Sequence, residues 1–484
     1  MTILLLSTYD MGRQPFGLAS PAAWLRRAGH DVHCVDLTRS RLADEAVLGA
    51  SLIAFYLPMH TATRLALAVI DRVTALNPAV HVCAYGLYAP LNAHILRAHG
   101  VRTVLGPEFE GQLSELADSF LLQAEATGNF VDATRGVLDA TGDAVEAKGG
   151  VGDANDGFIK PGGFRLQADD LLPRVAFITP DRSDLLPLRK YASLQVGADR
   201  KVVGYTEATR GCKHRCRHCP IVPVYDGRFR AVPLGVVMAD IRAQVAAGAE
   251  HITFGDPDFF NGPTHALGIV DALAREFPGV SYDVTIKVEH LRQQAAALPR
   301  LRDTRCAFVT TAVESFDDEV LAKLEKGHTH ADFVAVVRDC ESIGLALSPT
   351  FVAFTPWTTV ERYCAQLREI ERLGLVAAVS PIQYAIRLLI PQGSRMLELD
   401  EVRARIERFD PTSLTHVWRH ADPRVDALQQ ELERLVGSRL NAPRDEVFAR
   451  AWEIAHAAAG VAIPPREPLP SRATVPYLNE PWYC

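Results

Sequence analysis

The sequence of 484 residues lacks any apolar run of about 18 residues, the length that a helix needs to span a bilayer. Its start, residues 1–7, has no basic segment and continues into a strand-like pattern, so we expect no secretory signal. An excess of basic residues is also missing. The net charge is −7, with 51 Lys and Arg against 58 Asp and Glu. We therefore expect no membrane partner, and the charge argues against a nucleic-acid partner.

Cysteines are few, and their distribution excludes a disulfide framework. Of the nine, three lie close together and the rest are scattered. We therefore expect a reducing compartment, the cytoplasm. The hydrophobic fraction of 48% and the charged fraction of 23% are ordinary for a globular protein. Because the chain exceeds what one hydrophobic core usually supports, two or three domains are expected.

The three clustered cysteines are Cys212, Cys216 and Cys219, a C-x3-C-x2-C pattern within one loop-sized segment. Thiolates are preferred ligands of iron–sulfur clusters, and closely spaced cysteines let a short loop wrap one. A cluster of four irons has four ligand positions, so three cysteines leave one iron open, as a catalytic metal requires. The alternative is zinc in a non-catalytic binding or scaffold protein. No second Cys/His group follows at zinc-knuckle spacing.

This spacing resembles the cluster loop of the radical S-adenosylmethionine (radical SAM) enzymes. The resemblance implies a 4Fe-4S cluster held by the three cysteines, with S-adenosylmethionine on the fourth iron. It also implies a low-potential electron donor of flavodoxin or ferredoxin type. Reductive cleavage of S-adenosylmethionine then gives a 5′-deoxyadenosyl radical that removes hydrogen from a substrate. The sequence does not indicate which small molecule or peptide that substrate is.

Residues 1–122 alternate short apolar runs with helical stretches, which predicts a doubly wound parallel sheet. Strands are expected at 3–7, 32–37, 52–57, 80–85 and 102–105, and helices at 15–28, 62–76 and 91–98. The segment 15–32 resembles the opening of cobalamin-binding domains fused to radical SAM enzymes. Ligands of such sheets bind beyond the carboxyl ends of the strands. The candidate cobalamin contacts are Thr8, Tyr9, Pro58, Gly86 and Gly106.

One feature of the resembling domains is absent. One class of them supplies a histidine to cobalt from an Asp-x-His-x-x-Gly motif, whereas here Asp10 is followed two residues later by Gly12. Two alternatives stay open: cobalamin bound without a histidine ligand from the protein, or a domain with this fold and no cobalamin. With cobalamin, methyl transfer to an unactivated carbon or phosphorus is the expected reaction.

Residues 123–199 are expected to connect two domains, because their first half is rich in Ala, Gly, Asp and Thr and nearly free of aromatic residues. A small hairpin or two is expected there. Strands and helices alternate again over 200–395, with strands at 202–206, 251–254, 281–286, 306–313, 346–353 and 382–389. This pattern predicts a partial (β/α)6 TIM barrel, whose site lies at the carboxyl ends of its strands.

Several candidate cofactor contacts lie at those strand ends, and the resemblance assigns them. Gly255, Asp256 and Asp258 stand where the family has a Gly-Gly-Glu-like motif that holds the methionyl ammonium of S-adenosylmethionine. The alternative is that an aspartate caps the following helix. Glu314 resembles the position that bonds the cofactor ribose. His218, before the third cysteine, stands where an aromatic residue usually contacts adenine.

Two further candidates have alternative interpretations. Trp357 follows the fifth strand and is expected either to stack on adenine or to pack on the barrel rim. Arg387 lies among apolar neighbours, where an unpaired charge costs several kcal/mol. It is expected either to clamp a cofactor or substrate carboxylate, or to form a salt bridge with Glu314 or Asp256.

Residues 396–460 are predicted to be helical, with apolar residues at the spacing of two packing faces. From 461 to 484 the frequent prolines predict an extended tail without regular structure. The ending at 476–484 resembles radical SAM proteins named for a Cys-Cys-Ala-Glu-Pro or Cys-selenocysteine-Ala-Glu-Pro tail. We hypothesise that the chain stops after Cys484 at a UGA codon meant for selenocysteine. The alternative is a terminal cysteine without a role.

Overall fold

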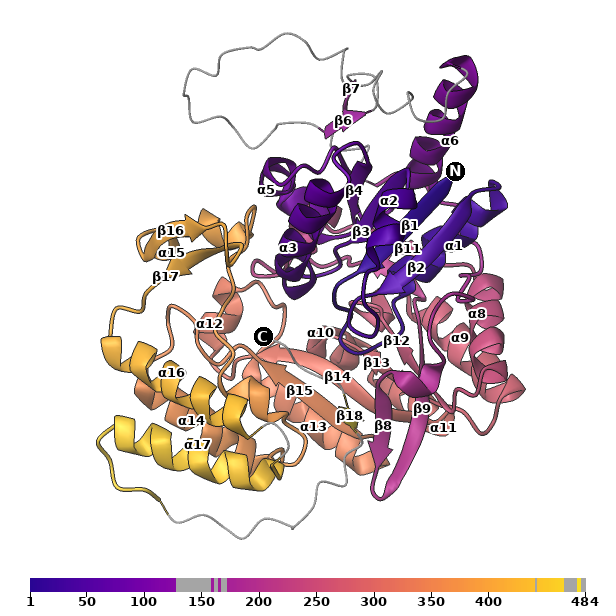
Figure 1. The fold of residues 1–484 in the computed structure, drawn as a ribbon. Coiled ribbons are helices and arrows are strands. Elements are labelled where there is room, and N and C mark those ends of the chain that lie inside the picture. The colour runs from indigo at the N-terminus through magenta and orange to yellow at the C-terminus, as the bar shows by residue number, and fades with distance from the viewer. Residues whose placement is uncertain (128–157, 161–163, 167–171, 440–441, 465–476, 480–484) are drawn as a thin grey trace. The chain divides into compact units, whose positions relative to one another are not determined.

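The structure is a computed structural model that describes residues 1–127, 158–160, 164–166, 172–439, 442–464 and 477–479 (Figure 1). The described residues divide into two compact units. The first comprises Met1–Tyr191 with Pro411–Leu414, and the second comprises Ala192–Asp410 with Thr415–Asn479. Cys484 and its neighbours lie outside the described residues, so the hypothesis about the tail stays a hypothesis.

The first unit contains a parallel five-stranded sheet with the order β2-β1-β3-β4-β5. Its strands are β1 (Thr2–Ser7), β2 (Asp31–Asp36), β3 (Leu52–Tyr56), β4 (His81–Tyr85) and β5 (Thr103–Val104). This is the flavodoxin-like order of a doubly wound fold. The predicted doubly wound sheet is therefore confirmed, with strand ends shifted by at most one residue.

Alternating side chains of the strands build a core on each face of this sheet, as the period of two in a strand requires. Ile3 and Leu5 pack on one face and Leu4 and Leu6 on the other. The helices of the first face are α1 (Phe16–Arg27) and α6 (Glu110–Thr127). Those of the second face are α2 (Asp44–Gly49), α3 (His60–Leu76), α4 (Tyr88–Leu91) and α5 (Ala93–Ala98). Of the helices on the two faces, α2 and α6 are not among the predicted ones.

Two features of the predicted connection are described. The strands β6 (Phe158–Lys160) and β7 (Phe164–Leu166) form an antiparallel hairpin, as expected. Further on, the backbone N–H of Asp181 donates to Ala19 in α1, and its carboxylate lies 2.8 Å from the Arg26 guanidinium. The predicted domain boundaries stay predictions.

The second unit contains a curled half-barrel sheet with the order β15-β14-β13-β12-β9-β8-β18 (Figure 1). The parallel strands are β9 (Asp199–Thr206), β12 (His251–Phe254), β13 (Ser281–Thr285), β14 (Cys306–Glu314) and β15 (Leu347–Phe351). Two further strands extend the sheet beyond β9: β8 (Ser193–Val196) pairs antiparallel with β9, and β18 (Tyr477–Asn479) pairs antiparallel with β8. The predicted partial barrel is confirmed as a fold class.

Helices connect the parallel strands of this sheet, and one more, α14 (Val360–Arg372), follows the last of them, β15. The connecting helices are α8 (Leu234–Ala246), α9 (Pro263–Glu276), α10 (Val288–Gln293), α11 (Leu298–Asp303), α12 (Asp318–Lys323) and α13 (His330–Ile343). Thr329 begins α13 with a capping box, because its side chain accepts from the Asp332 N–H while the Asp332 carboxylate accepts from Thr329. Gly344 ends the same helix in the left-handed conformation.

Two predictions about regular structure were wrong. The strand expected at 382–389 is replaced by the 3-10 helix η7 (Pro381–Tyr384) and a single parallel bridge between Phe354 and Arg387. Pro381 at the start of η7 fixes a helical φ and offers no N–H to a sheet. The tail expected to lack regular structure contains β18, because three of the four residues between prolines 476 and 481 can still pair with β8.

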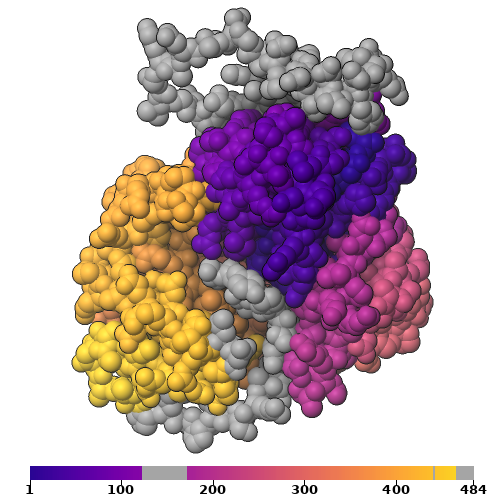
Figure 2. All heavy atoms as spheres, in the orientation of Figure 1, coloured from indigo at the N-terminus to yellow at the C-terminus, as the bar shows by residue number. Residues whose placement is uncertain are grey.

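The predicted helical region contains the two expected helices, α16 (Pro423–Ser438) and α17 (Arg444–Ala458), orange and yellow in Figure 2, which pack against each other. Val425, Leu428 and Leu432 line the buried face of α16 at helical spacing. A hairpin of β16 (Ile406–Asp410) and β17 (Thr415–Trp418), which was not predicted, precedes them. Within the described residues, every helix is too short or too polar to cross a membrane.

Candidate functional site

The cysteine loop is closed at its base by a short hairpin. Strand β10 (Thr209–Gly211) enters the loop and pairs with β11 (Phe229–Ala231) beyond it. Gly211 has φ 74°, and a Cβ there would overlap the ring of Tyr225. Only glycine therefore allows the turn into the first cysteine.

The loop brings its thiols into surroundings of low polarity. Cys216 is buried, and its carbonyl accepts a hydrogen bond of 3.1 Å from the backbone N–H of Cys219. Burial raises the pKa of Cys212 to about 12 and that of Cys219 to about 11. Ionisation of these thiols at neutral pH thus requires positive charge at the sulfur atoms, which a metal centre supplies.

A buried ammonium group provides further positive charge beside the loop. Although burial opposes its charge, Glu314 and the thiols of Cys216 and Cys219 raise the pKa of Lys326. Its Nζ atom lies 3.1 Å from Oε1 of Glu314. Three thiols in one short loop, next to a fixed cation, form a donor set that fits an anionic iron–sulfur cluster.

Glu314, at the end of β14, joins this cation to the cysteine loop. Nε2 of His218 lies 3.1 Å from the same Oε1 atom. Burial opposes ionisation of Glu314, but Lys326 and His218 outweigh it and hold the pKa of the carboxyl well below its usual range. Glu314 has φ 68°, a left-handed conformation uncommon for residues with a side chain, and the β14–β15 register shifts there.

The first acidic candidate after β12 is bound to its own chain. Asp256 accepts 2.9 Å from the backbone N–H of Ala208 and 2.6 Å from the hydroxyl of Thr209, so it holds the entry to β10. Burial, partly offset by these hydrogen bonds, raises the pKa of Asp256 to about 7. At Gly255 a Cβ would overlap the hydroxyl of Tyr205, which explains the glycine. The contact of both residues with S-adenosylmethionine stays a prediction.

Asp258 caps a helix, as the alternative interpretation held, and it also meets two histidines. Its carboxylate accepts from the backbone N–H of Phe260 in the 3-10 helix η5 (Phe259–Asn261). Its Oδ2 atom lies 2.7 Å from Nδ1 of His290 and 3.6 Å from Nε2 of His214. Burial, Lys287 and His290 lower the pKa of His214 to about 4, so that ring is neutral at pH 7.

The grouping of these histidines with Asp258 was not predicted. The side-chain donor atoms of His214, Asp258 and His290 all lie within 4.8 Å of one another. Histidine and carboxylate are metal ligands in general. His214 is inside the cysteine loop, whereas His290 lies after β13, so only the barrel fold makes them neighbours.

Trp357 and Arg387 lie in packed surroundings. Trp357 packs on an apolar cluster that includes Val320, and its ring centroid is 5.2 Å from the Lys323 ammonium. The guanidinium of Arg387 lies 2.7 Å from Asp426 of α16, donates 2.7 Å to the Trp418 carbonyl, and lies 3.6 Å from the Trp418 ring centroid.

The salt bridge expected for Arg387 is therefore wrong in its partner, which is neither Glu314 nor Asp256. A carboxylate on α16 reaches it, 39 residues further along the chain. No local pattern in the sequence indicates this pairing. The cofactor contacts expected for Arg387 and Trp357 stay predictions.

In the first unit, the candidate cobalamin contacts follow the carboxyl ends of β1, β3, β4 and β5. Gly86 and Gly106 are joined by a backbone hydrogen bond of 3.2 Å. Gly86 has φ 110°, and a Cβ there would lie 2.9 Å from the Leu57 carbonyl oxygen. The hydroxyl of Thr8 donates to the Ala62 carbonyl at 2.7 Å. The sheet thus gathers the predicted positions at one edge, while their role stays a prediction.

Comparison with known proteins identifies one domain. Residues 206–358 match the model of the radical SAM superfamily. The tRNA-2-methylthio-N(6)-dimethylallyladenosine synthase of Chlorobium limicola is 25% identical over 183 residues, 36% of this chain and 40% of that protein. The ribosomal protein uS12 methylthiotransferase RimO of Desulfosudis oleivorans is 24% identical over 163 residues, 30% and 36% respectively. The chain spans about two fifths of the length of the curated relatives it matches.

Solved structures resemble this chain over a greater length. The cobalamin-dependent S-adenosylmethionine radical enzyme OxsB, with aqua-cobalamin and S-adenosylmethionine bound, has a TM-score of 0.68 at 12% identity, covering 94% of this chain and 71% of that chain. The radical S-adenosylmethionine methyltransferase TsrM of Kitasatospora setae, with cobalamin and a [4Fe-4S] cluster, has a TM-score of 0.54 at 18% identity, covering 77% and 70%. At these identities, the similarity shows that this chain shares the fold of the two enzymes.

The superfamily match and the cysteine loop agree on the cofactors. A radical SAM domain implies a 4Fe-4S cluster and S-adenosylmethionine, as the spacing of Cys212, Cys216 and Cys219 predicts. The chain therefore contains a radical SAM domain in residues 206–358, and this domain supports an enzyme.

Proposed function

We propose that the chain is a cobalamin-dependent radical SAM methyltransferase. The observation that carries the proposal is the presence, in one chain, of a flavodoxin-like unit and a half-barrel with the C-x3-C-x2-C loop. Both OxsB and TsrM, which resemble this chain in fold, are described with cobalamin. TsrM is a radical S-adenosylmethionine methyltransferase.

We assign the cluster to the thiolates of Cys212, Cys216 and Cys219. When bound, the cluster and S-adenosylmethionine supply an electron and a carbon radical, and cobalamin supplies a methyl carrier. Lys326 offsets the negative charge of the thiolates, since the sulfur atoms of Cys216 and Cys219 act on its pKa. The six other cysteines are not at ligand spacing, and five of them are buried in the described residues.

We assign the adenosyl part of the cofactor to His218 and Glu314. Nδ1 of His218 is buried and has no hydrogen-bond partner within the described residues, so this edge of the ring is open to a ligand. Glu314 stays ionised because Lys326 and His218 hold its pKa low, and a carboxylate has lone pairs left for ribose hydroxyls. Asp258 is assigned to the methionyl ammonium, with Asp256 fixing the loop entry beside it.

We assign cobalamin to the carboxyl edge of the first sheet, at Thr8, Tyr9, Pro58, Gly86 and Gly106. The positive φ of Gly86 keeps the backbone free of a side chain at this edge. The loop after β1 has Asp10 and Gly12 without the motif histidine. The proposal is therefore a cobalamin whose cobalt has no histidine ligand from this loop.

The proposed partners follow from the chemistry. Radical SAM enzymes use a reductant, and we propose a flavodoxin- or ferredoxin-like protein as the electron donor. The substrate is proposed to be a small molecule or a peptide. The net charge of −7 does not favour a tRNA substrate of the kind named for the curated relatives.

Anaerobic reconstitution with iron and sulfide tests this proposal. A brown protein that retains cobalamin, releases 5′-deoxyadenosine or S-adenosylhomocysteine under reduction and moves a labelled methyl group to cobalamin is the expected result. A colourless protein that contains zinc in place of iron would overturn the cluster assignment. A brown protein without cobalamin would keep the radical SAM domain and overturn the methyltransferase proposal.

A further inference from the structure

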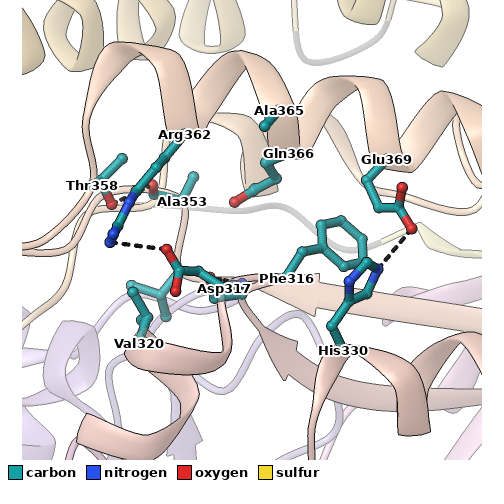
Figure 3. A pocket seen from close by; sticks show the side chains of 12 residues that line it. Phe316, Asp317, Val320, His330, Ala353, Thr358, Arg362, Ala365, Gln366 and Glu369 are labelled. Atoms are coloured by element: carbon teal, nitrogen blue, oxygen red, sulfur yellow. Dashed lines mark hydrogen bonds and ion pairs between the residues drawn. The ribbon is translucent and has the colours of Figure 1, made fainter.

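A pocket of about 350 Å³ lies in the second unit, apart from the cysteine loop. Helix α14 forms one wall, and the segment from Ser315 to Val320 with the start of α13 forms the opposite wall (Figure 3). Phe316 lines it and also packs on Phe333 of α13 and Phe351 of β15. The pocket is therefore on the helix-covered side of the sheet. None of the residues assigned above to the cluster or to S-adenosylmethionine lines it.

Each end of the pocket has an ion pair. At one end, the guanidinium of Arg362 lies 2.9 Å from the carboxylate of Asp317. At the other, Nε2 of His330 lies 2.7 Å from Oε1 of Glu369. Arg362 and Glu369 are seven residues apart on one face of α14, which separates their Cα atoms by about 10 Å along the helix. Figure 3 shows the two pairs on either side of the pocket.

Between the two ion pairs lies a buried carboxamide with an unsatisfied group. Gln366 is only 8% exposed, and its Nε2 atom has no hydrogen-bond partner within the described residues. It follows Arg362 by four residues, so both side chains share a face of the helix. Buried polar groups are nearly always hydrogen-bonded, and an exception calls for an unseen partner. The amide therefore indicates a ligand with an acceptor group.

The charge of the lining fits a ligand with a net positive charge. Apart from His330, the ionisable lining residues are the carboxylates of Asp317 and Glu369 and the guanidinium of Arg362. Just outside the lining, Arg372 also pairs with Glu369 and Glu319 also pairs with Arg362, so three carboxylates stand against two guanidinium groups. The wall between the two ends is apolar, formed by residues such as Phe316, Val352 and Ala365. A ligand that matches this arrangement has an anionic and a cationic group at one end, an aliphatic middle and a second cation at the other end.

We propose that this pocket binds a free basic α-amino acid. Arg362 and the Nε2 atom of Gln366 bind its α-carboxylate, because a guanidinium and an amide donor side by side suit two carboxylate oxygens. Asp317 accepts from the α-ammonium group, and Glu369 accepts from the side-chain cation. A pocket of about 350 Å³ holds roughly a dozen groups the size of a water molecule, enough for a molecule of this kind.

This site is separate from the proposed methyl transfer, but it adjoins the cofactor region through the chain. Ser315 lines the pocket and directly follows Glu314, which contacts His218 of the cysteine loop. The proposal requires neither cobalamin nor a particular substrate of the radical chemistry.

Titration calorimetry of the reconstituted full chain with L-lysine tests the proposal. Three matched compounds each lack one charged group: lysinamide has no carboxylate, 6-aminohexanoate has no α-ammonium, and L-norleucine has no side-chain amine. L-lysine is expected to bind saturably, and each of the three to bind about tenfold more weakly or worse. An absence of saturable binding, or equal affinity for L-lysine and L-norleucine, would overturn the proposal.

Variants of α14 locate the binding. Gln366→Leu and Arg362→Gln are each expected to weaken L-lysine binding about tenfold, while Glu369→Gln narrows the preference for L-lysine over L-norleucine. Arg368→Gln, on the exposed face of the same helix, is the matched control and leaves the affinity unchanged. Circular dichroism and the colour of the cluster verify folding in each variant. Because Arg362 is 42% exposed, its variant remains informative if Gln366→Leu fails to fold. Unchanged affinity in both variants contradicts the assigned site.

Discussion

Nε2 of His218, inside the cysteine loop, lies 3.1 Å from Oε1 of Glu314 at the end of β14. The Lys326 ammonium lies at the same distance from that oxygen. All three side chains are largely removed from solvent, with 14%, 9% and 3% exposure. The carboxylate of Glu314 thus connects the cysteine loop to the end of β14 and to the ammonium of Lys326. This explains how a left-handed residue is held at a strand end.

Replacement of Lys326 by methionine is expected to destabilise the fold by about 3–5 kcal/mol, because it leaves Glu314 as a buried charge without its main partner. The double variant Lys326→Met with Glu314→Gln removes the charge as well and is expected to recover part of this loss. Urea unfolding of the metal-free protein measures both. Lys323→Met is the control. It breaks the more exposed pair with Glu401 and the contact with the Trp357 ring, and together these are expected to cost about 1 kcal/mol or less.

Substitution of one cysteine tests the assigned cluster ligands. Cys216→Ala is expected to lose the brown colour and most of the iron on anaerobic reconstitution, because a cluster held by two cysteines lacks a required ligand. Cys306→Ala is the matched control, since this buried thiol at the start of β14 donates to the Phe308 carbonyl and lies outside the C-x3-C-x2-C loop. Iron and sulfide analysis with visible absorbance gives the result. Full iron content in Cys216→Ala contradicts the ligand assignment.

The parts of the fold that local patterns encode could be predicted. Strand β12 has the predicted bounds, because His251 and three apolar or β-branched residues are followed directly by Gly255. The cysteine loop was recognisable because its donors are separated by only two or three residues. The parallel sheets followed from strands that alternate with helices.

Other features depend on contacts between distant segments and leave no local signal. Asp426 pairs with Arg387 across 39 residues, and His290 reaches His214 across 76. The strand β18 exists because β8 offers an edge, although its own sequence lies between prolines. The pocket beside α14 arises from residues on the three helices α12, α13 and α14 and on the segments that follow β14 and β15, so no single segment indicates it.

Stability of the first unit is expected to fall between about pH 6.5 and pH 3 through one histidine. Burial, with a smaller effect of Arg102, lowers the pKa of His81 to about 3. Below the ordinary pKa the unfolded chain binds a proton that the folded chain does not, so stability is lost as the pH falls. At about pH 5.5 the loss relative to pH 7.5 is about 1.4 kcal/mol.

The variant His81→Gln isolates this effect, since it removes the titrating ring and retains a donor for the Thr103 hydroxyl, 2.8 Å from Nε2 in the parent. Urea unfolding of parent and variant is compared at both pH values. The parent is expected to lose about 1.4 kcal/mol more than the variant on acidification. Equal losses in the two proteins would show that His81 is protonated in the folded state.

Substitution of Arg387, at the last bridge of the sheet, tests whether this residue contributes to packing or to cofactor binding. Arg387→Met removes the ion pair with Asp426 and the contact with the Trp418 ring, which together are expected to contribute about 1–2 kcal/mol at this partly exposed site. Arg387→Lys keeps the charge but not the planar group, so it recovers only part of the loss. The KM for S-adenosylmethionine is expected to stay within about twofold of the parent in both variants. A KM raised tenfold or more at unchanged stability would instead make Arg387 a cofactor contact. The variant Asp426→Asn separates the two roles, because it weakens the ion pair while leaving the guanidinium in place.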